Sequence, residues 1–288
     1  MAEGPDGFAV VDKAAGWTSH DVVAKARGIL GTKRVGHAGT LDPGATGVLL
    51  LGVGRATRLL RFVGDLPKRY VGEVVLGTET TTLDDEGEVT AIHDMTAVTL
   101  EAVRAAAVRF VGDIEQVPPM VSALKVGGRR LHELARAGIE VERRPRPVTV
   151  HSLEVTGPVD DPGAPVFRIE VECSSGTYVR TLAADLGSAL GGGAHLRRLR
   201  RTAIGPHTLA GARPLDDLVL LPMAAAVGHL ARVAVDRDGA ELVATGRLPP
   251  LDLEGDGPWS VMGPDGELLA VAERVGDRVK PGIVLAAR

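Results

Sequence analysis

Two kinds of apolar periodicity are mixed along this chain of 288 residues, and they follow no regular order. Strand-like alternation or short buried runs occur at residues 8–11, 48–53, 69–76 and 166–172. Helical spacing occurs at residues 20–30, 100–110 and 181–190, with Ser19 and Gly31 expected to cap the first helix. Because a doubly wound parallel sheet needs regular alternation of strands and helices, the mixture predicts an α+β fold, with a mixed, mainly antiparallel central sheet flanked by helices.

The length of the chain suits one substantial core and a small satellite core. The pattern of predicted elements changes after about residue 230, where short strands with alternating apolar residues are expected at 259–262 and 268–272. We therefore expect a large domain over residues 1–230 and a small β-rich module over residues 231–288.

The composition limits the cellular compartments and the kinds of chemistry that we expect for this protein. The single cysteine, Cys173, excludes an intramolecular disulfide framework and a cysteine metal cluster, and favours a reducing compartment. It lies in an alternating strand, which predicts a buried, inert thiol. The first residues do not resemble a secretory signal, and the longest apolar stretch, 218–230, is too short to span a bilayer. We expect a soluble cytoplasmic protein.

Charge is segregated along the chain, although the formal net charge is only -4. Three segments are strongly basic: residues 55–69, 121–147 and 194–213. The second overlaps a stretch rich in proline and glycine with a short helical piece near 131–137, which predicts an excursion from the core. If the three segments converge, they form a phosphate-binding surface; ordinary solvated charge is the alternative. The acid-free third segment contains Arg197, Arg198, Arg200, Arg201 and Arg213.

The densest candidate site is the glycine-rich segment at residues 36–47, which carries His37, Asp42 and Pro43 among four glycines. Glycines let the backbone approach a ligand closely, and Pro43 fixes the backbone after Asp42. Such a loop can hold one carboxylate in a defined place, although a tight turn with a solvated aspartate has the same spacing. A phosphate-binding P-loop is disfavoured because Ala45 stands where lysine is needed. A metal site at His37 and Asp42 is disfavoured because no second histidine is near.

A second candidate segment, SSGTYVRTL at residues 174–182, places Tyr178 and Arg180 two positions apart. If the preceding strand continues through them, both side chains point to one face. An aromatic ring beside a guanidinium suits a flat base and a phosphate or carboxylate. The alternative is a tyrosine at a strand end with an arginine that reaches to solvent.

Taken together, the segments resemble one family, the bacterial TruB tRNA pseudouridine synthases, which convert a uridine in the T-loop of tRNA. Roughly the first three quarters of the chain match in order. The matching segments are VVDKAAGWTSHDVV (10–23), RVGHAGTLDPGATGVLLLGVGRATR (34–58), KRYVGEVVLG (68–77), the stretch 113–148, CSSGTYVRTLAADLG (173–187) and GGGAHLRRLRRTAIG (191–205). Ala14 departs from the family pattern, which usually has proline there.

The resemblance implies a role for individual residues. Asp42 would be the catalytic carboxylate, and His37 would help to displace and hold the target nucleotide. Tyr70 would stack on the uracil ring, and Arg180 would pair with the catalytic aspartate. The other implied positions are Tyr178 and Leu199, which line the uridine site, Lys13, which is mainly structural, and Asp84, which matches a near-site residue in a segment, 78–85, whose pattern is altered.

The resemblance also implies a substrate and partners. The insertion at residues 113–148 would clasp the T-loop, in agreement with the basic excursion, and residues 231–288 would form a PUA-like domain. We expect tRNA, modified at position 55 in the TΨC arm, as the partner of a monomer that uses no metal or cofactor. RNA phosphates are expected to contact Lys125, Arg129, Arg130, Arg197, Arg198, Arg200 and Arg201. Two alternatives are a guide-RNA-dependent synthase of the dyskerin type and a non-catalytic protein that binds or folds tRNA.

Overall fold

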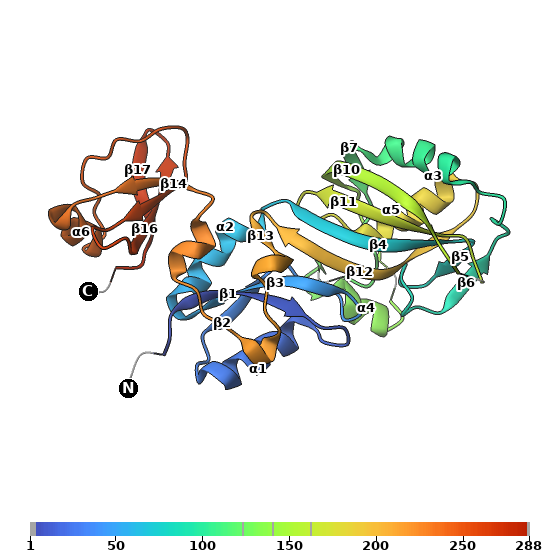
Figure 1. The fold of residues 1–288 in the computed structure, drawn as a ribbon, viewed down its shortest axis with the longest axis horizontal. Coiled ribbons are helices and arrows are strands. Elements are labelled where there is room, and N and C mark those ends of the chain that lie inside the picture. Colours follow the sequence, from blue (N-terminus) through green and yellow to red (C-terminus); the bar gives the residue numbers. More distant parts are fainter. Residues whose placement is uncertain (1–3, 123, 140, 162, 287–288) are drawn as a thin grey trace.

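The computed structural model describes residues 4–122, 124–139, 141–161 and 163–286 (Figure 1). Its main sheet runs in the order β1-β3-β12-β4-β11-β10-β7, with β2 paired to β3 and β13 paired to β12. Every pair is antiparallel except β3 and β12, so the predicted fold class is confirmed. The strands are β1 (Gly7–Lys13), β2 (Val35–Ala38), β3 (Thr46–Val53), β4 (Lys68–Leu76), β7 (Gly112–Gln116), β10 (Arg146–Val159), β11 (Val166–Cys173), β12 (Ala194–Ile204) and β13 (His207–Thr208).

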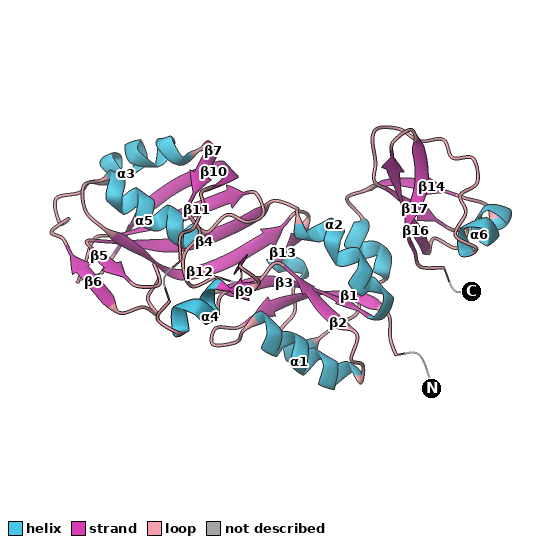
Figure 2. Ribbon diagram, turned by 180° about the vertical axis from the view of Figure 1, so that it is seen from behind, coloured by secondary structure: helices cyan, strands magenta, loops and turns pink. Residues whose placement is uncertain are grey.

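Helices cover the two ends of this sheet differently (Figure 2). Helices α3 (Leu100–Ala107) and α5 (Val179–Ala189) pack on β4, β10, β11 and β12 to form one apolar core. Helix α1 (Ser19–Leu30) packs on one face of β1 and β3, and α2 (Leu60–Gly64), preceded by the turn η1 (Gly54–Leu59), packs on the other. Among the described helices, none is long and apolar enough to cross a membrane. Shorter elements are β5 (Thr78–Thr80), β6 (Val89–Ile92), η2 (Val108–Phe110), η3 (Leu209–Gly211), η4 (Leu215–Asp217) and η5 (Met223–Val227).

One predicted boundary is wrong by a single residue, and one condition set on the sequence is not met. The N-cap of α1 is Thr18, not Ser19, because Thr18 and Asp21 form a reciprocal capping box. The strand before residue 174 does not continue through Tyr178 and Arg180, because the chain turns at Gly176, with a positive φ of 87°. Tyr178 is instead the N-cap of α5, and Arg180 lies in its first turn.

The two ends of the predicted excursion, residues 113–148, belong to the neighbouring strands β7 and β10, and only the part between these strands leaves the sheet. It consists of a short hairpin, β8 (Lys125–Val126) and β9 (Arg129–Arg130), followed by α4 (Leu131–Arg136), where a short helical piece was predicted. Because β7 and β10 pair directly, the segment leaves and re-enters the sheet at one place.

The strands from Ala231 onward form a sheet of their own, β14-β15-β16-β17, with helix α6 (Arg237–Ala244). Leu268, Val271 and Ile283 of this sheet share an apolar cluster with Leu59 and Val63 of the large domain. The strands are β14 (Ala231–Ala234), β15 (Trp259–Met262), β16 (Leu268–Val275) and β17 (Arg278–Val284).

Three arginines of the basic segment 55–69 hold this module. Arg55 donates to the carbonyl of Leu285 at 2.6 Å, Arg58 donates to the carbonyl of Val284 at 2.8 Å, and Arg61 pairs with Glu273. Segment 55–69 was expected to join a phosphate surface only if the basic segments converge, and three of its guanidinium groups bind the C-terminal sheet instead.

Gly47, at the start of β3, provides a test of the fold. Its φ is 102°, and an added Cβ would collide with the carbonyl oxygen of Arg201 on the neighbouring strand β12. We expect Gly47→Ala to lower the free energy of unfolding by about 3 kcal/mol or more, because strain and backbone overlap add. Gly276→Ala is the matched control: its φ is 60° in open space, so about 1 to 2 kcal/mol is expected. Equal losses in urea unfolding of the two variants would contradict the close approach of β3 and β12.

Candidate active site

A hollow of about 310 Å³ opens where the loop between β2 and β3 meets β4, β12 and the start of α5. Five residues predicted from the sequence come together in its lining although they lie far apart in the chain. They are Asp42, Tyr70, Tyr178, Arg180 and Leu199.

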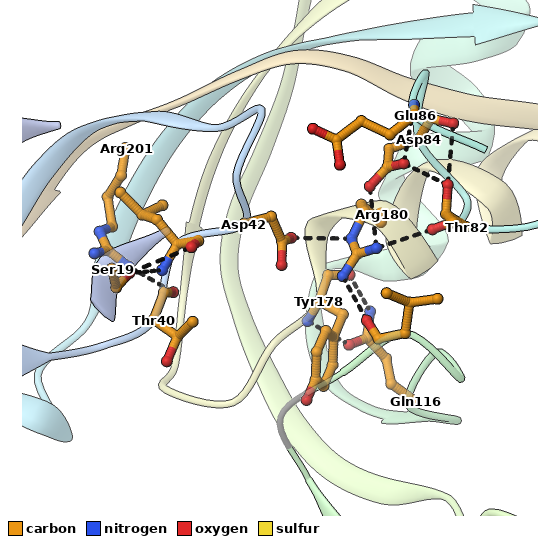
Figure 3. Close-up of polar contacts among 12 residues, drawn as sticks. Ser19, Thr40, Asp42, Thr82, Asp84, Glu86, Gln116, Tyr178, Arg180 and Arg201 are labelled. Atoms are coloured by element: carbon orange, nitrogen blue, oxygen red, sulfur yellow. Dashed lines mark hydrogen bonds and ion pairs between the residues drawn. The ribbon is translucent and has the colours of Figure 1, made fainter. Parts of the chain in front are cut away.

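Asp42 is paired with a buried guanidinium in this hollow (Figure 3). Arg180 Nε lies 3.1 Å from Asp42 Oδ2, and Arg180 Nη1 lies 3.0 Å from Asp84 Oδ2. The remaining donors of Arg180 reach the carbonyls of Thr82 and Val121, each at 3.0 Å. Only 4% of the Arg180 side chain is exposed. Two carboxylates and two carbonyls therefore fix the guanidinium, which in turn orients the carboxylate of Asp42.

Burial raises the pKa of Asp42 above the usual range of an aspartate, and the Arg180 guanidinium opposes this shift. The carboxylate of Asp84 adds to the rise, whereas Lys13 and Arg201 oppose it. Yet 41% of the side chain is exposed, so the carboxylate faces the hollow. A second hollow of about 270 Å³ adjoins the pair and is lined by Asp84, Asp85 and Glu86.

The loop that carries Asp42 is fastened to the N-terminal strand. Lys13 is buried, and its ammonium donates to the carbonyls of Ala14, Trp17 and Pro43 at 2.7 to 3.1 Å. Burial lowers the pKa of Lys13 to about 8, and nearby Asp42 opposes this shift. The position of Lys13 fits the structural role that the resemblance implies.

Two further polar residues support the site and were missed by sequence reasoning. Ser19 accepts from the backbone N–H of Leu41 at 2.9 Å and donates to its carbonyl, so it pins the residue before Asp42. Gln116 bonds both the N–H and the carbonyl of Tyr178 at 3.0 and 3.3 Å. Both are buried, and each lies beside a motif, but only the tertiary structure reveals their partners.

Tyr70 lies on β4 with its ring in the wall of the hollow, and its exposed surface is only 8%. Burial raises the pKa of its phenol, while the neighbouring Arg201 opposes the shift, so the hydroxyl is neutral at physiological pH. Leu199 of β12 adds an apolar side chain to the lining of the same hollow. An aromatic ring and an apolar side chain in one hollow with a carboxylate suit a planar base attached to a sugar.

His37 is on β2 and does not line either hollow at Asp42. Its ring contacts that of His20 edge to face, with centroids 5.5 Å apart, and its Nδ1 is buried without a hydrogen-bond partner among the described residues. Burial lowers the pKa of His37 to about 4, and His20 contributes. His37 is therefore neutral at physiological pH.

The arginines of β12 differ in accessibility. Arg197 is held by Glu73 at 2.9 Å and Asp161 at 2.8 Å, and Arg200 is held by Asp12 at 2.7 Å. Arg198 is the most open, with 67% of its side chain exposed.

Arg201 is fully buried, so the expectation that it contacts RNA phosphate at the surface is corrected. Of the phosphate contacts predicted in the excursion, Arg129 is exposed, and the side chains of Lys125 and Arg130 lie outside the described residues.

The described residues were expected to hold neither a cluster of metal ligands nor a reactive thiol. No group of three or more histidine, cysteine, aspartate or glutamate side chains there is arranged to hold a metal ion. Cys173 is buried, and its burial raises the pKa of the thiol to about 11, so it stays protonated as expected.

Comparison with known proteins agrees with this geometry. The model of the TruB family pseudouridylate synthase N-terminal domain matches residues 27–179, and that of the tRNA pseudouridylate synthase B C-terminal domain matches residues 180–226. A protein named tRNA pseudouridine synthase B from Streptomyces coelicolor is 51% identical over 93% of both chains. One of the same name from Rhodococcus jostii is 48% identical over 97% of this chain and 93% of that one.

Among solved structures, the archaeal box H/ACA sRNP Nop10-Cbf5 complex matches with a TM-score of 0.73 at 25% identity. The match covers 98% of this chain and 86% of that chain. Fold and site therefore define a pseudouridylate synthase. Within that class, the chain belongs to the TruB family.

The neutral state of His37 is testable. Between pH 6.5, the ordinary pKa, and about 4, the unfolded imidazole binds a proton that the folded one does not, so stability falls as pH decreases through this window. We expect imidazole nitrogen shifts, assigned by their loss in His37→Asn, to report a neutral His37 ring at pH 5.5. We also expect His37→Asn to lose less stability than wild type between pH 6.5 and 4. Half-protonation near pH 6.5 would contradict burial as the controlling effect.

Proposed function

We propose that this protein isomerises the uridine at position 55, in the T-loop of tRNA, to pseudouridine, with Asp42 as its single essential carboxylate. The observation that carries the proposal is the ion pair of Asp42 with buried Arg180 at the mouth of a hollow walled by Tyr70 and Leu199. The relatives' shared name supplies the substrate class.

The reaction needs one carboxylate and no external reagent. The bond from ribose C1′ to uracil N1 breaks, the base turns, and C1′ bonds to C5, whose proton moves to N1. Glycosidases need a second carboxylate to activate water, but here no water enters the product. One ionised Asp42 serves either as nucleophile at C1′ or as the base that removes a proton from C2′. Arg180 keeps it ionised and aimed into the hollow.

The target uridine must leave the stack of the T-loop to reach Asp42, at a cost of a few kcal/mol. Stacking on the Tyr70 ring returns about 1 to 3 kcal/mol of that. Tyr178 lies across the same hollow, at the N-cap of α5, where Gln116 holds its backbone. His37, on the strand that leads into the Asp42 loop, would assist the displaced nucleotide rather than the bond-breaking step.

Phosphate contacts would come from β12 and from the excursion between β7 and β10. Arg198, the most exposed arginine of β12, is the strongest candidate. The excursion contributes Arg129, and its Val121 carbonyl accepts a hydrogen bond from Arg180, which links the excursion to the site. We expect the protein to act on tRNA in the cytoplasm as a monomer, without an obligate protein partner.

The central test is Asp42→Asn, which keeps the size of the side chain and removes its charge. We expect it to fold and bind tRNA but to lose pseudouridine formation by at least about 1,000-fold, because Asp42 is the one carboxylate among the described residues that line the hollow. Tritium release from tRNA that contains 5-tritiated uridine measures the rate. Asp265→Asn, in the turn between β15 and β16, is the control and is expected to keep wild-type turnover.

The same assay separates the alternatives. Purified wild-type protein is expected to act on unmodified tRNA without guide RNA or partner proteins, and turnover only in their presence would favour the guide-dependent type. Tight binding of tRNA without any turnover would favour a non-catalytic protein. Near-wild-type turnover by Asp42→Asn would remove Asp42 from the reaction.

Arg197 and Arg198 provide a paired test of the phosphate surface. Each neutralised phosphate releases counterions, so the slope of log affinity against log salt should fall by about 1 in Arg198→Gln. Arg197→Gln should change the slope less, because Glu73 and Asp161 already hold Arg197. Filter binding from 50 to 300 mM salt measures both slopes. An unchanged slope in Arg198→Gln would exclude that contact.

A further inference from the structure

Arg201 is a charged side chain with no exposed surface, in the wall of the hollow. Its Nε donates to the carbonyl of Val48 at 2.7 Å, and its Nη2 donates to the carbonyl of Gly39 at 2.9 Å. Nη1 lies 3.4 Å from the carbonyl oxygen of Thr40. The guanidinium thus bonds the first residues of the Asp42 loop and the strand that follows it.

The backbone of Arg201 holds the other end of the same loop. Strands β3 and β12 pair in parallel at two positions only, and one of them joins Arg201 to Gly47. Gly39 also lacks room for a side chain, because a Cβ there would lie 3.3 Å from Arg201 Nη1 on a backbone with a φ of 78°. Arg201 therefore holds both ends of the loop between Gly39 and Gly47.

Arg201 also contacts the residue that walls the base pocket. On its other side, β12 pairs with β4, where Arg201 stands opposite Tyr70. The Arg201 guanidinium lies near enough to the Tyr70 phenol to oppose the rise in its pKa that burial causes. The Asp42 loop and Tyr70 consequently both depend on the position of Arg201.

The charge of Arg201 distinguishes it from its neighbours. Arg180, Arg197, Arg198 and Arg200 each pair with a carboxylate, whereas within the described residues Arg201 takes part in no ion pair. A buried charge without a carboxylate partner is costly, and carbonyl groups compensate it only in part. Its field acts on Asp42, whose ionised form it favours.

We propose that Arg201 is a positioning residue for the isomerisation, which locks the Asp42 loop and the Tyr70 ring into one arrangement and adds a further positive charge near the carboxylate. This inference rests on the proposed function. It assigns Arg201 to the interior of the site rather than to the RNA surface.

Two variants separate geometry from charge. Arg201→Lys keeps the charge but cannot bridge Val48 and Gly39 together, so we expect kcat to fall about 10- to 100-fold with KM nearly unchanged. Arg201→Gln loses the charge as well, and we expect kcat to fall by more than about 100-fold. Neither variant should change the salt dependence of tRNA binding, because the side chain is buried.

The pH profile is the readout that a merely structural residue would not move. The charged groups that face Asp42 are Arg180, Lys13, Asp84, Glu86 and Arg201. Because removal of a cation raises the pKa of Asp42, the acid limb of kcat/KM should move to higher pH in Arg201→Gln. It should stay at the wild-type position in Arg201→Lys.

Arg104→Gln is the control, because it removes an arginine–carbonyl bond of 3.0 Å to Val155, on α3 outside the site, and should leave the pH profile unchanged. Wild-type kcat in Arg201→Lys, or an unmoved acid limb in Arg201→Gln, would overturn the proposal. If Arg201→Gln does not fold, kcat of Arg201→Lys decides alone. If wild-type protein makes no pseudouridine, the proposed function fails instead, so the two failures are distinguishable.

Discussion

The parallel register of β3 with β12, only two residues long, is the constraint on which the rest of this structure depends. It joins the N-terminal strands to the antiparallel strands that carry α3 and α5, and each side has its own apolar core. Because the strands touch at only two positions, the space beside them stays open. The Asp42 loop, Tyr70 and Leu199 all meet in that space.

The charged side chains of the site lie close to the two paired positions of β3 and β12. Arg180 is held by Asp42, Asp84 and two carbonyls, so its orientation does not depend on bound RNA. One of those carbonyls belongs to Val121 in the excursion. A shift of the excursion on RNA binding would therefore reach the Arg180 guanidinium through one hydrogen bond.

The sequence predicted the elements well, because period-2 and helical spacing reflect burial on one face. Strands β1, β3, β4 and β11 and helices α1 and α3 lie where periodicity placed them. The start of α5 was mispredicted, because the turn at Gly176 depends on backbone conformation rather than on apolar pattern.

Sequence motifs predicted the residues of the candidate site, but they did not predict the residues that hold these side chains in place. The sequence of an arginine cluster does not show which side chains point to solvent and which point into the protein. Here an irregularity in register between Arg197 and Arg200, with a φ of 53° at Arg198, decides that Arg201 points inward. Likewise, nothing in segment 55–69 distinguishes a guanidinium that meets RNA from one that binds the carbonyl of Leu285. Partners separated by 230 positions are set by tertiary structure alone.

The apolar cluster shared by Leu59, Val63, Leu268 and Ile283 packs the small sheet against the large domain through buried side chains. A boundary drawn near residue 230 separates the two sheets, and apolar contacts cross it. Cutting the chain there would uncover apolar surface on both pieces. A substitution at Leu268, Val271 or Ile283 therefore alters the packing of η1 and α2 as well as that of the small sheet.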